Sequence, residues 1–360
     1  MSFNAANLDL EYKPDFDVCM ERVYAWYEGE IIDRIPVRFS AHNAEFEQIG
    51  KTDRWNTIKD RWFDTQYQVD HFISTLKEPF LGETFPVFWP NLGPNVFAAI
   101  LGAGIEFGDV TSWSHSVVDS VYEIEKINFN QNSEYLNKLV ELTDYALDRC
   151  EDKFIVGYTD IHPSLDCLDA LRGTQGLLLD MYDDPKATHS LIEKCYEPFD
   201  NLMMLFFDKL KAKNQPSVNW MNIPSFEGVH VPSCDLGAMI SLAQFDEFAL
   251  SYIKREIKLF KHNIFHVDGV GVANHIDSIL QIEQVNAIQW VQGVGKDRPI
   301  MQWVPFIKKI QAYGKGVVVD LQLCELEDFI AQVSPKGIYL CIDESDIDIQ
   351  KSVLDRIMKW

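Results

Sequence analysis

The sequence predicts an α/β protein, a (β/α)8 TIM barrel that forms a single domain and carries extra helices at its N-terminal end. Short runs rich in Val, Ile, Phe, Tyr and Trp alternate with longer stretches of helical periodicity, which predicts a parallel sheet. About eight such runs fit into the 360 residues. No G-x-G-x-x-G dinucleotide motif follows the first run, so a barrel is favoured over an open sheet.

The expected strands have interiors of mostly β-branched and aromatic residues, as in strands that are buried on both faces. They are IPVRFS (35–40), FPVFW (85–89), FIVGYTD (154–160), SVNWMNI (217–223), IFHVDG (264–269), NAIQWVQG (286–293), GVVVDL (316–321) and GIYLCID (337–343).

The expected helices follow from apolar residues at helical spacing and from start and stop signals. One opens with Asp then Pro, which is a favoured helix start, and another stops at a Gly. The barrel domain is expected to span 1–360, with a helical N-terminal extension and a second helical layer over its N-terminal part. The helical segments are 1–34, 43–81, 133–150, 183–213, 244–262, 298–314 and 324–334.

Composition limits the possible partners and the compartment. The formal net charge is −23, from 55 acidic and 32 basic residues, which repels nucleic-acid phosphates and anionic membranes. No apolar run reaches the ~20 residues of a membrane span, and the N-terminal segment lacks the pattern of a signal peptide. The seven cysteines are scattered without close pairs. We therefore expect a cytoplasmic protein that binds a small molecule and neither nucleic acid nor membrane.

In a barrel of this kind the chemistry lies at the carboxyl ends of the strands. Polar and aromatic side chains follow most of the predicted strands at that end, and they form the list of candidate site residues: Trp89, Asn91, Asp160, His162, Trp220, Asn222, His266, Asp268, Trp290, Gln292, Asp320, Cys341 and Asp343.

The pair His266 and Asp268 has three interpretations. Alternate residues of a strand face the same side, so the pair can chelate one metal ion, and Cys341 or Cys234 can supply a third ligand for zinc. The pair can instead handle a proton, with Asp268 as the acid–base group and His266 as a relay. The third interpretation is a structural hydrogen bond at a turn whose glycines permit positive φ.

The other candidates also have a functional and an ordinary interpretation. Asp160 and His162 repeat the His–Asp pattern at another strand end, where they form either a site or a turn. Arg172 can neutralise a substrate carboxylate or form an ion pair at a helix end. The strand-end tryptophans Trp89, Trp220 and Trp290 can line a pocket or pack in the core.

Four segments resemble the uroporphyrinogen decarboxylase-like superfamily. FHVDGVGVANHIDSILQIEQVNAIQWVQGVG (265–295) is similar to its HLDG…IQW…G-x-G block, and VGYTDIHPSLDCLDALRGTQGLLLDMYDDP (156–185) is similar to another block. DRIPVRFS (33–40) resembles the first strand, and residues 88–113 resemble a further block. The resemblance covers most of the chain. It implies a (β/α)8 fold and a homodimer.

The superfamily has two branches, and each implies a different function. Decarboxylases are metal-free and carry an arginine-rich loop resembling M-R-Q-A-G-R, where this chain has only Arg38 and His42. Corrinoid-dependent methyltransferases bind zinc through His-x-Cys and a distant Cys. Here the first motif reads His266-x-Asp268, Gly337 stands near the last ligand position, and Cys341 lies two alternations further along the same face.

The leading prediction is therefore a corrinoid-linked, zinc-dependent methyltransferase or demethylase for a small methylated substrate. His266, Asp268 and Cys341 or Cys234 would hold zinc, while Asp160 and His162 would contact substrate or act as a general acid. The corrinoid would come from a separate protein, since the chain lacks the D-x-H-x-x-G cobalamin motif. The alternatives are a metal-free decarboxylase, with Asp268 or Asp160 facing the developing cation, and a non-catalytic barrel that binds a ligand.

Overall fold

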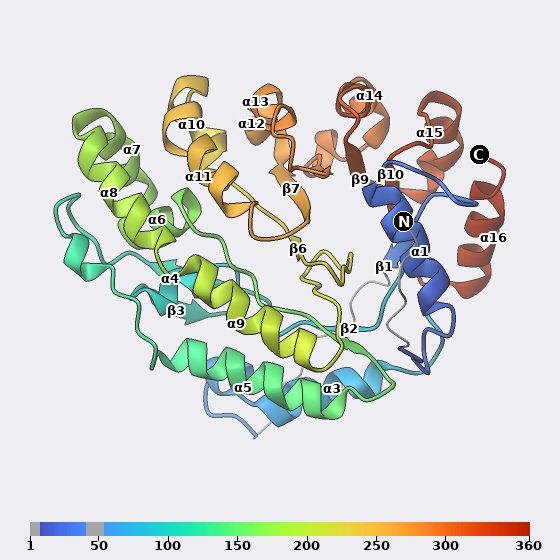
Figure 1. The fold of residues 1–360 in the computed structure, drawn as a ribbon, viewed down its shortest axis with the longest axis horizontal. Coiled ribbons are helices and arrows are strands. Elements are labelled where there is room, and N and C mark those ends of the chain that lie inside the picture. The colour runs from blue at the N-terminus through green and yellow to red at the C-terminus, as the bar shows by residue number, and fades with distance from the viewer. Residues whose placement is uncertain (1–7, 41–53) are drawn as a thin grey trace.

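The computed structural model of the protein describes residues 8–40 and 54–360. Its helices form an outer layer around centrally placed strands (Figure 1). His42 and parts of the expected helical segments 1–34 and 43–81 lie outside the described residues. In the described part of the chain, no helix combines the length and the apolar character that crossing a membrane requires.

The main sheet is parallel and curls so that the first strand pairs with the last. Its hydrogen-bonded order is β1 (Val37–Ser40), β10 (Ile338–Asp343), β9 (Gly316–Leu321), β8 (Ala287–Val291), β7 (His262–Asp268) and β6 (Val229–His230). A second parallel pair joins β2 (Val87–Phe88) to β5 (Ile155–Val156), and β3 (Gly104–Phe107) forms an antiparallel hairpin with β4 (Ser112–His115). The parallel α/β architecture expected from the sequence is confirmed.

The prediction of a closed barrel is wrong, because the six-stranded sheet and the β2–β5 pair are not joined by a regular ladder in the described chain. β1 approaches the next segment through an isolated bridge between Arg38 and Gly82. The expected strand 217–223 contributes only a bridge between Ser217 and Ser225, together with a bond of 2.8 Å from the Tyr158 N–H to the Val218 carbonyl. The sheet is therefore a curled half-barrel with a TIM-like arrangement of helices.

The predicted helices occur at the expected positions, but two of them are each divided into two shorter helices. The expected helix at 133–150 is confirmed as α5 (Glu134–Arg149). Residues 183–213 form α8 (Pro185–Tyr196) and α9 (Phe199–Ala212), separated at Pro198, which has no N–H to continue the first helix. Residues 244–262 likewise divide into α10 (Leu242–Phe248) and α11 (Leu250–Glu256), and the remaining predicted helices are α14 (Val304–Ala312) and α15 (Leu326–Gln332).

Further helices complete the outer layer. The N-terminal extension contains α1 (Phe16–Tyr27), and the second predicted layer contains α2 (Ile58–Trp62) and α3 (Thr65–Thr75). The sequence reading missed α4 (Val96–Ile100), α6 (Leu165–Arg172), α7 (Thr174–Asp183), α12 (Gly269–Ala273), α13 (Ile276–Leu280) and α16 (Ile347–Ile357).

Strand alternation separates an inner core from an outer one. In β7, Ile264 belongs to the inner cluster, whereas Phe265 and Val267 pack in the outer cluster under the helices. Trp26 of α1 joins the inner cluster, and its indole N–H donates to the Gly337 carbonyl at 2.8 Å. Because side chains alternate along a strand, His266 and Asp268 face the same inner side as Ile264, at the carboxyl end of β7.

Candidate metal and substrate site

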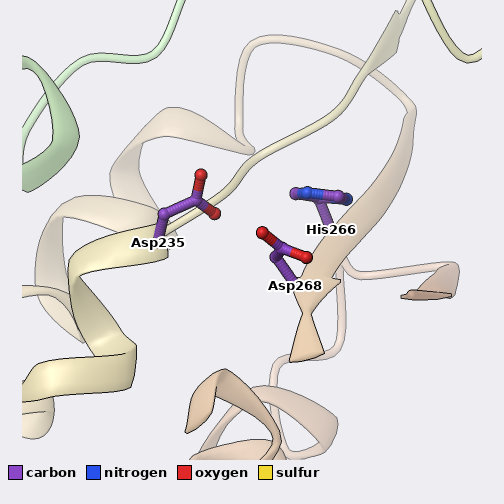
Figure 2. A group of neighbouring side chains, drawn as sticks. All are labelled: Asp235, His266 and Asp268. Atoms are coloured by element: carbon purple, nitrogen blue, oxygen red, sulfur yellow. The ribbon is translucent and has the colours of Figure 1, made fainter. Parts of the chain in front are cut away.

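Three side chains meet at the carboxyl end of β7. His266 and Asp268 project from the strand, and Asp235 faces them from the short 3-10 helix η3 (Asp235–Met239) (Figure 2). Each offers one ligand atom, and these atoms all lie within 4.8 Å of one another. Two carboxylates and one imidazole form a donor set that suits zinc and other divalent transition metals.

His266 is held in an orientation that leaves one ring nitrogen available. Its Nδ1 lies 2.6 Å from Oε1 of Gln289 on the neighbouring strand β8. An amide oxygen can only accept, so Nδ1 carries the hydrogen and Nε2 keeps its lone pair. This resembles the outer-shell hydrogen bond that fixes the tautomer of metal-binding histidines. In the described chain the hydrogen-bond partner of this imidazole is Gln289, not Asp268.

Asp235 is fixed through its backbone by Asp166 of α6. One carboxylate oxygen of Asp166 accepts from the Asp235 N–H at 3.0 Å and from the Ser233 hydroxyl at 2.9 Å, and the other accepts from the Leu236 N–H at 3.1 Å. Asp235 is exposed, but partial desolvation and the charge of Asp166 raise its pKa to about 6, and Asp268 adds to this rise. The carboxylate of Asp235 is therefore held where other negative charges oppose its ionisation, as expected of a site for a cation.

A second His–Asp pair lies next to this group. The His162 Nε2 is 2.7 Å from the Asp160 Oδ1, and the His162 Nδ1 is 3.2 Å from the Ser233 hydroxyl. Burial works to lower the pKa of His162, but the carboxylate of Asp160, aided by Asp166, outweighs it and raises that pKa to about 10. At neutral pH, His162 is consequently an imidazolium that carries a transferable proton.

Two cavities adjoin these groups. The smaller, of about 180 Å³, is lined by Asp160, His162, Asp166, Ser233, Asp235 and His266 among others. The larger, of about 440 Å³, has aromatic walls that include Phe72, Phe88, Trp89 and Trp220. Asp160 and Trp220 line both, so the polar chamber and the aromatic cavity meet at these two residues.

The structure brings some of the predicted site residues together in these cavities. Trp89, Asn91 and Asn222 line the larger cavity. The half-buried Trp220 meets the His266 ring edge-on, with the ring centres 5.3 Å apart. These residues come from different strand ends and loops.

Other predicted residues lie apart from both cavity linings. Arg172 forms an ion pair with Asp180 at 2.7 Å. Trp290 is fully buried on the outer face of β8 against Trp303 and Phe306. Gln292 donates to the carbonyls of Arg298 and Asp320 at 2.9 and 3.1 Å.

The two cysteines considered as ligands also lie outside the group of three. Cys234 is buried, and burial raises the pKa of its thiol well above the ordinary value. Cys341 faces the inner core beside Arg38, and burial raises the pKa of its thiol to about 12. The next residue, Asp235, lies beside His266 and Asp268, where the sequence analysis expected Cys234.

Sequence reasoning missed Asp235, Asp166, Ser233 and Gln289. Gln289 carried a usable signal, because it is a lone amide within the apolar run NAIQWV. Asp235 and Ser233 flank Cys234 in the segment VPSCDLG, which has no periodicity from which side-chain directions could be read.

Comparisons with known proteins support the fold. Neither a protein family nor a curated protein matches the sequence. A methyltransferase from Methanosarcina mazei of known structure superimposes with a TM-score of 0.59 over 95% of this chain and 98% of its own, at 8% sequence identity. At that identity the likeness shows a shared fold.

Proposed function

We propose that this protein is a methyltransferase in which Asp235, His266 and Asp268 hold a zinc ion. The observation that carries the proposal is the convergence of these three ligands within 4.8 Å beside the charged His162. The aromatic cavity, which meets this chamber at Asp160 and Trp220, supplies room for a small methylated substrate. The fold shared with a methyltransferase from Methanosarcina mazei agrees with this assignment.

The chemistry is an acid-assisted displacement. Zinc bound at the three ligands would polarise the oxygen next to the transferred methyl group. His162, kept charged by Asp160, donates a proton to that oxygen as the carbon–oxygen bond breaks. A reduced corrinoid carried by a separate protein would supply the acceptor for the methyl group, and the demethylated substrate would leave as an alcohol or phenol. Trp89 and Trp220 wall the cavity and limit the access of water.

Metal content is the first test. Purified wild-type protein, assayed by plasma mass spectrometry after zinc is added back and excess removed, should hold about one zinc per chain, as one tetrahedral set of ligands implies. Asp235→Asn, His266→Ala and Asp268→Ala should each lose it. Asp277→Asn is the matched control, because this exposed carboxylate pairs with Lys309 at 2.7 Å, away from the site.

The second test is transfer of a methyl group to free cob(I)alamin, followed by the change in its absorbance. The zinc-loaded protein should transfer methyl from a methyl ether, and the three ligand variants should not. A wild-type protein without zinc after reconstitution would refute the proposal. The metal-free decarboxylase and the non-catalytic binding barrel would then be the functions to test.

A further inference from the structure

We infer that the larger cavity selects a flat substrate that carries a carboxylate at the end remote from the transferred methyl group, and that Arg61 binds this carboxylate. The inference rests on the proposed function for the identity of the reacting group, and it names the class of substrate. It depends on the polarity of the cavity, on the surroundings of Arg61 and on the size of the space.

The lining of the cavity combines residues shared with the polar chamber, a cationic side chain and apolar side chains. Asp160 and Trp220 mark the inner end, because they also line the chamber that contains His266 and Asp235. Arg61, Gln68 and His71 come from α2 and α3 and line the larger cavity but not the polar chamber. The lining also includes aromatic and aliphatic side chains: Trp62, Phe72, Phe88 and Leu142. A ligand with its methyl group at the inner end therefore places its other end toward a cationic group.

Arg61 keeps hydrogen-bonding capacity for a ligand. Its side chain is only 14% exposed, and the nearest carboxylate, that of Asp109, lies at 3.8 Å and is 75% exposed. Within the described residues its guanidinium donates to one group, the Asp109 carbonyl, at 2.5 Å. A guanidinium has five N–H donors in a planar fork, so an edge remains for a carboxylate.

Most other arginines of this acidic chain have a carboxylate closer to the guanidinium than Arg61 has. A carboxylate oxygen lies within 3.0 Å of the guanidinium of Arg54, Arg149, Arg172, Arg255 and Arg356. With 55 acidic residues available, an arginine that lines a cavity and has only a distant, exposed carboxylate is suited to an anion that arrives with the substrate.

The size of the cavity excludes the smallest methyl donors as a good fit. A space of about 440 Å³ falls in the range for small-molecule sites, and methanol would leave most of it unfilled. The aromatic walls favour a planar ring between the two polar ends. A methoxylated aromatic carboxylate matches all three features. Its methyl ether suits the inner end at Asp160, its ring suits the aromatic walls, and its carboxylate suits Arg61.

Calorimetric titration with two probes tests the inference. The probes are 4-methoxybenzoate and 4-methoxybenzyl alcohol, which share the ring and the methyl ether and differ in the charged group. Wild type should bind the carboxylate at least about tenfold more tightly, which is the low end for a charge-assisted hydrogen bond. Arg61→Gln should remove this preference and leave the affinity for the alcohol within about threefold. Arg61→Lys should keep part of it, because the charge remains without the fork.

Arg54→Gln is the matched control, because Arg54 is half exposed, pairs with Asp64 and lies outside this cavity. It should leave both affinities unchanged. Equal binding of the two probes by wild type, a preference that survives Arg61→Gln, or no binding of either probe would overturn the inference. The titration needs neither metal nor methyl transfer, so a carboxylate preference without zinc binding would refute the proposed function and leave the Arg61 subsite standing.

Discussion

Replacing Asp160 by Asn is expected to turn His162 from an imidazolium into a neutral imidazole at pH 7. The two side chains are 12% and 15% exposed, and the His162 Nε2 lies 2.7 Å from the Asp160 Oδ1. Burial alone lowers the pKa of His162, and the nearby carboxylates reverse this effect. Without Asp160, burial should dominate, and the pKa of His162 should fall to its ordinary value of 6.5 or below.

The energy involved follows from the pKa. Each pKa unit corresponds to about 1.4 kcal/mol, so a rise from 6.5 to about 10 corresponds to about 5 kcal/mol of preference for the charged ring. The folded protein binds this proton more tightly than the unfolded chain does. The resulting stabilisation is present in full below pH 6.5 and is lost as the pH rises from 6.5 toward 10. Asp160→Asn should abolish this alkaline loss.

The assay is a histidine titration by NMR, with one ring signal assigned to His162 by its absence in His162→Gln. In wild type this signal should titrate near pH 10, and in Asp160→Asn it should titrate at or below 6.5. Glu106→Gln is the control, since it removes the carboxylate of an exposed His–Glu pair and should leave the His162 signal in place. A His162 signal that titrates near 6.5 in wild type would refute the assignment of this residue as a charged acid.

The remaining predictions concern stability and follow from single buried contacts. Burial lowers the pKa of His262 to about 4, so stability should fall by up to about 3 kcal/mol between pH 6.5 and 4; His262→Gln should flatten this slope in denaturant unfolding, and an unchanged slope would contradict the assignment. Trp26→Phe leaves the buried Gly337 carbonyl without its hydrogen-bond donor and should lower the free energy of unfolding by about 1–3 kcal/mol in the same assay. A loss below about 0.5 kcal/mol would show that this hydrogen bond is dispensable. Trp290→Phe should lower stability by about 1–3 kcal/mol without changing zinc content or probe affinity, because Trp290 packs on the outer face of β8; altered probe affinity would place it in the site.

The sequence predicts the alternation of β7 and fails on that of β8, for one physical reason. In β7 the polar residues His266 and Asp268 stand two apart at the end of an apolar run, so their common face is evident. In β8 both faces are buried and mostly apolar, so the single amide of Gln289 is the only sign of which side faces the site. The prediction chose Trp290 instead, whereas the structure turns Gln289 toward the site.

The continuity of the barrel depends on contacts that sequence patterns do not encode. Residues 217–223 have the composition of a strand, but Asn222 has a positive φ of 56° and Ser217 pairs backward with Ser225. This antiparallel turn takes up backbone groups that a regular ladder to β5 would need. Only isolated hydrogen bonds, such as that from the Tyr158 N–H to the Val218 carbonyl, remain between the two segments. The first-to-last pairing of β1 with β10, by contrast, follows from the alternation of strands and helices that the sequence does show.

The fold holds Asp235 at a position where neighbouring carboxylates disfavour the charge of its own carboxylate. Two backbone N–H groups and the Ser233 hydroxyl bind Asp166, and these bonds hold the start of η3 beside β7. The same carboxylate of Asp166 contributes to raising the pKa of Asp235, so the anchor that positions the ligand also opposes its ionisation. A group kept where its charge is disfavoured is typical of functional sites and uncommon in purely structural ones. A divalent cation among Asp235, His266 and Asp268 would remove this conflict, because its positive charge would favour the ionised form of both carboxylates.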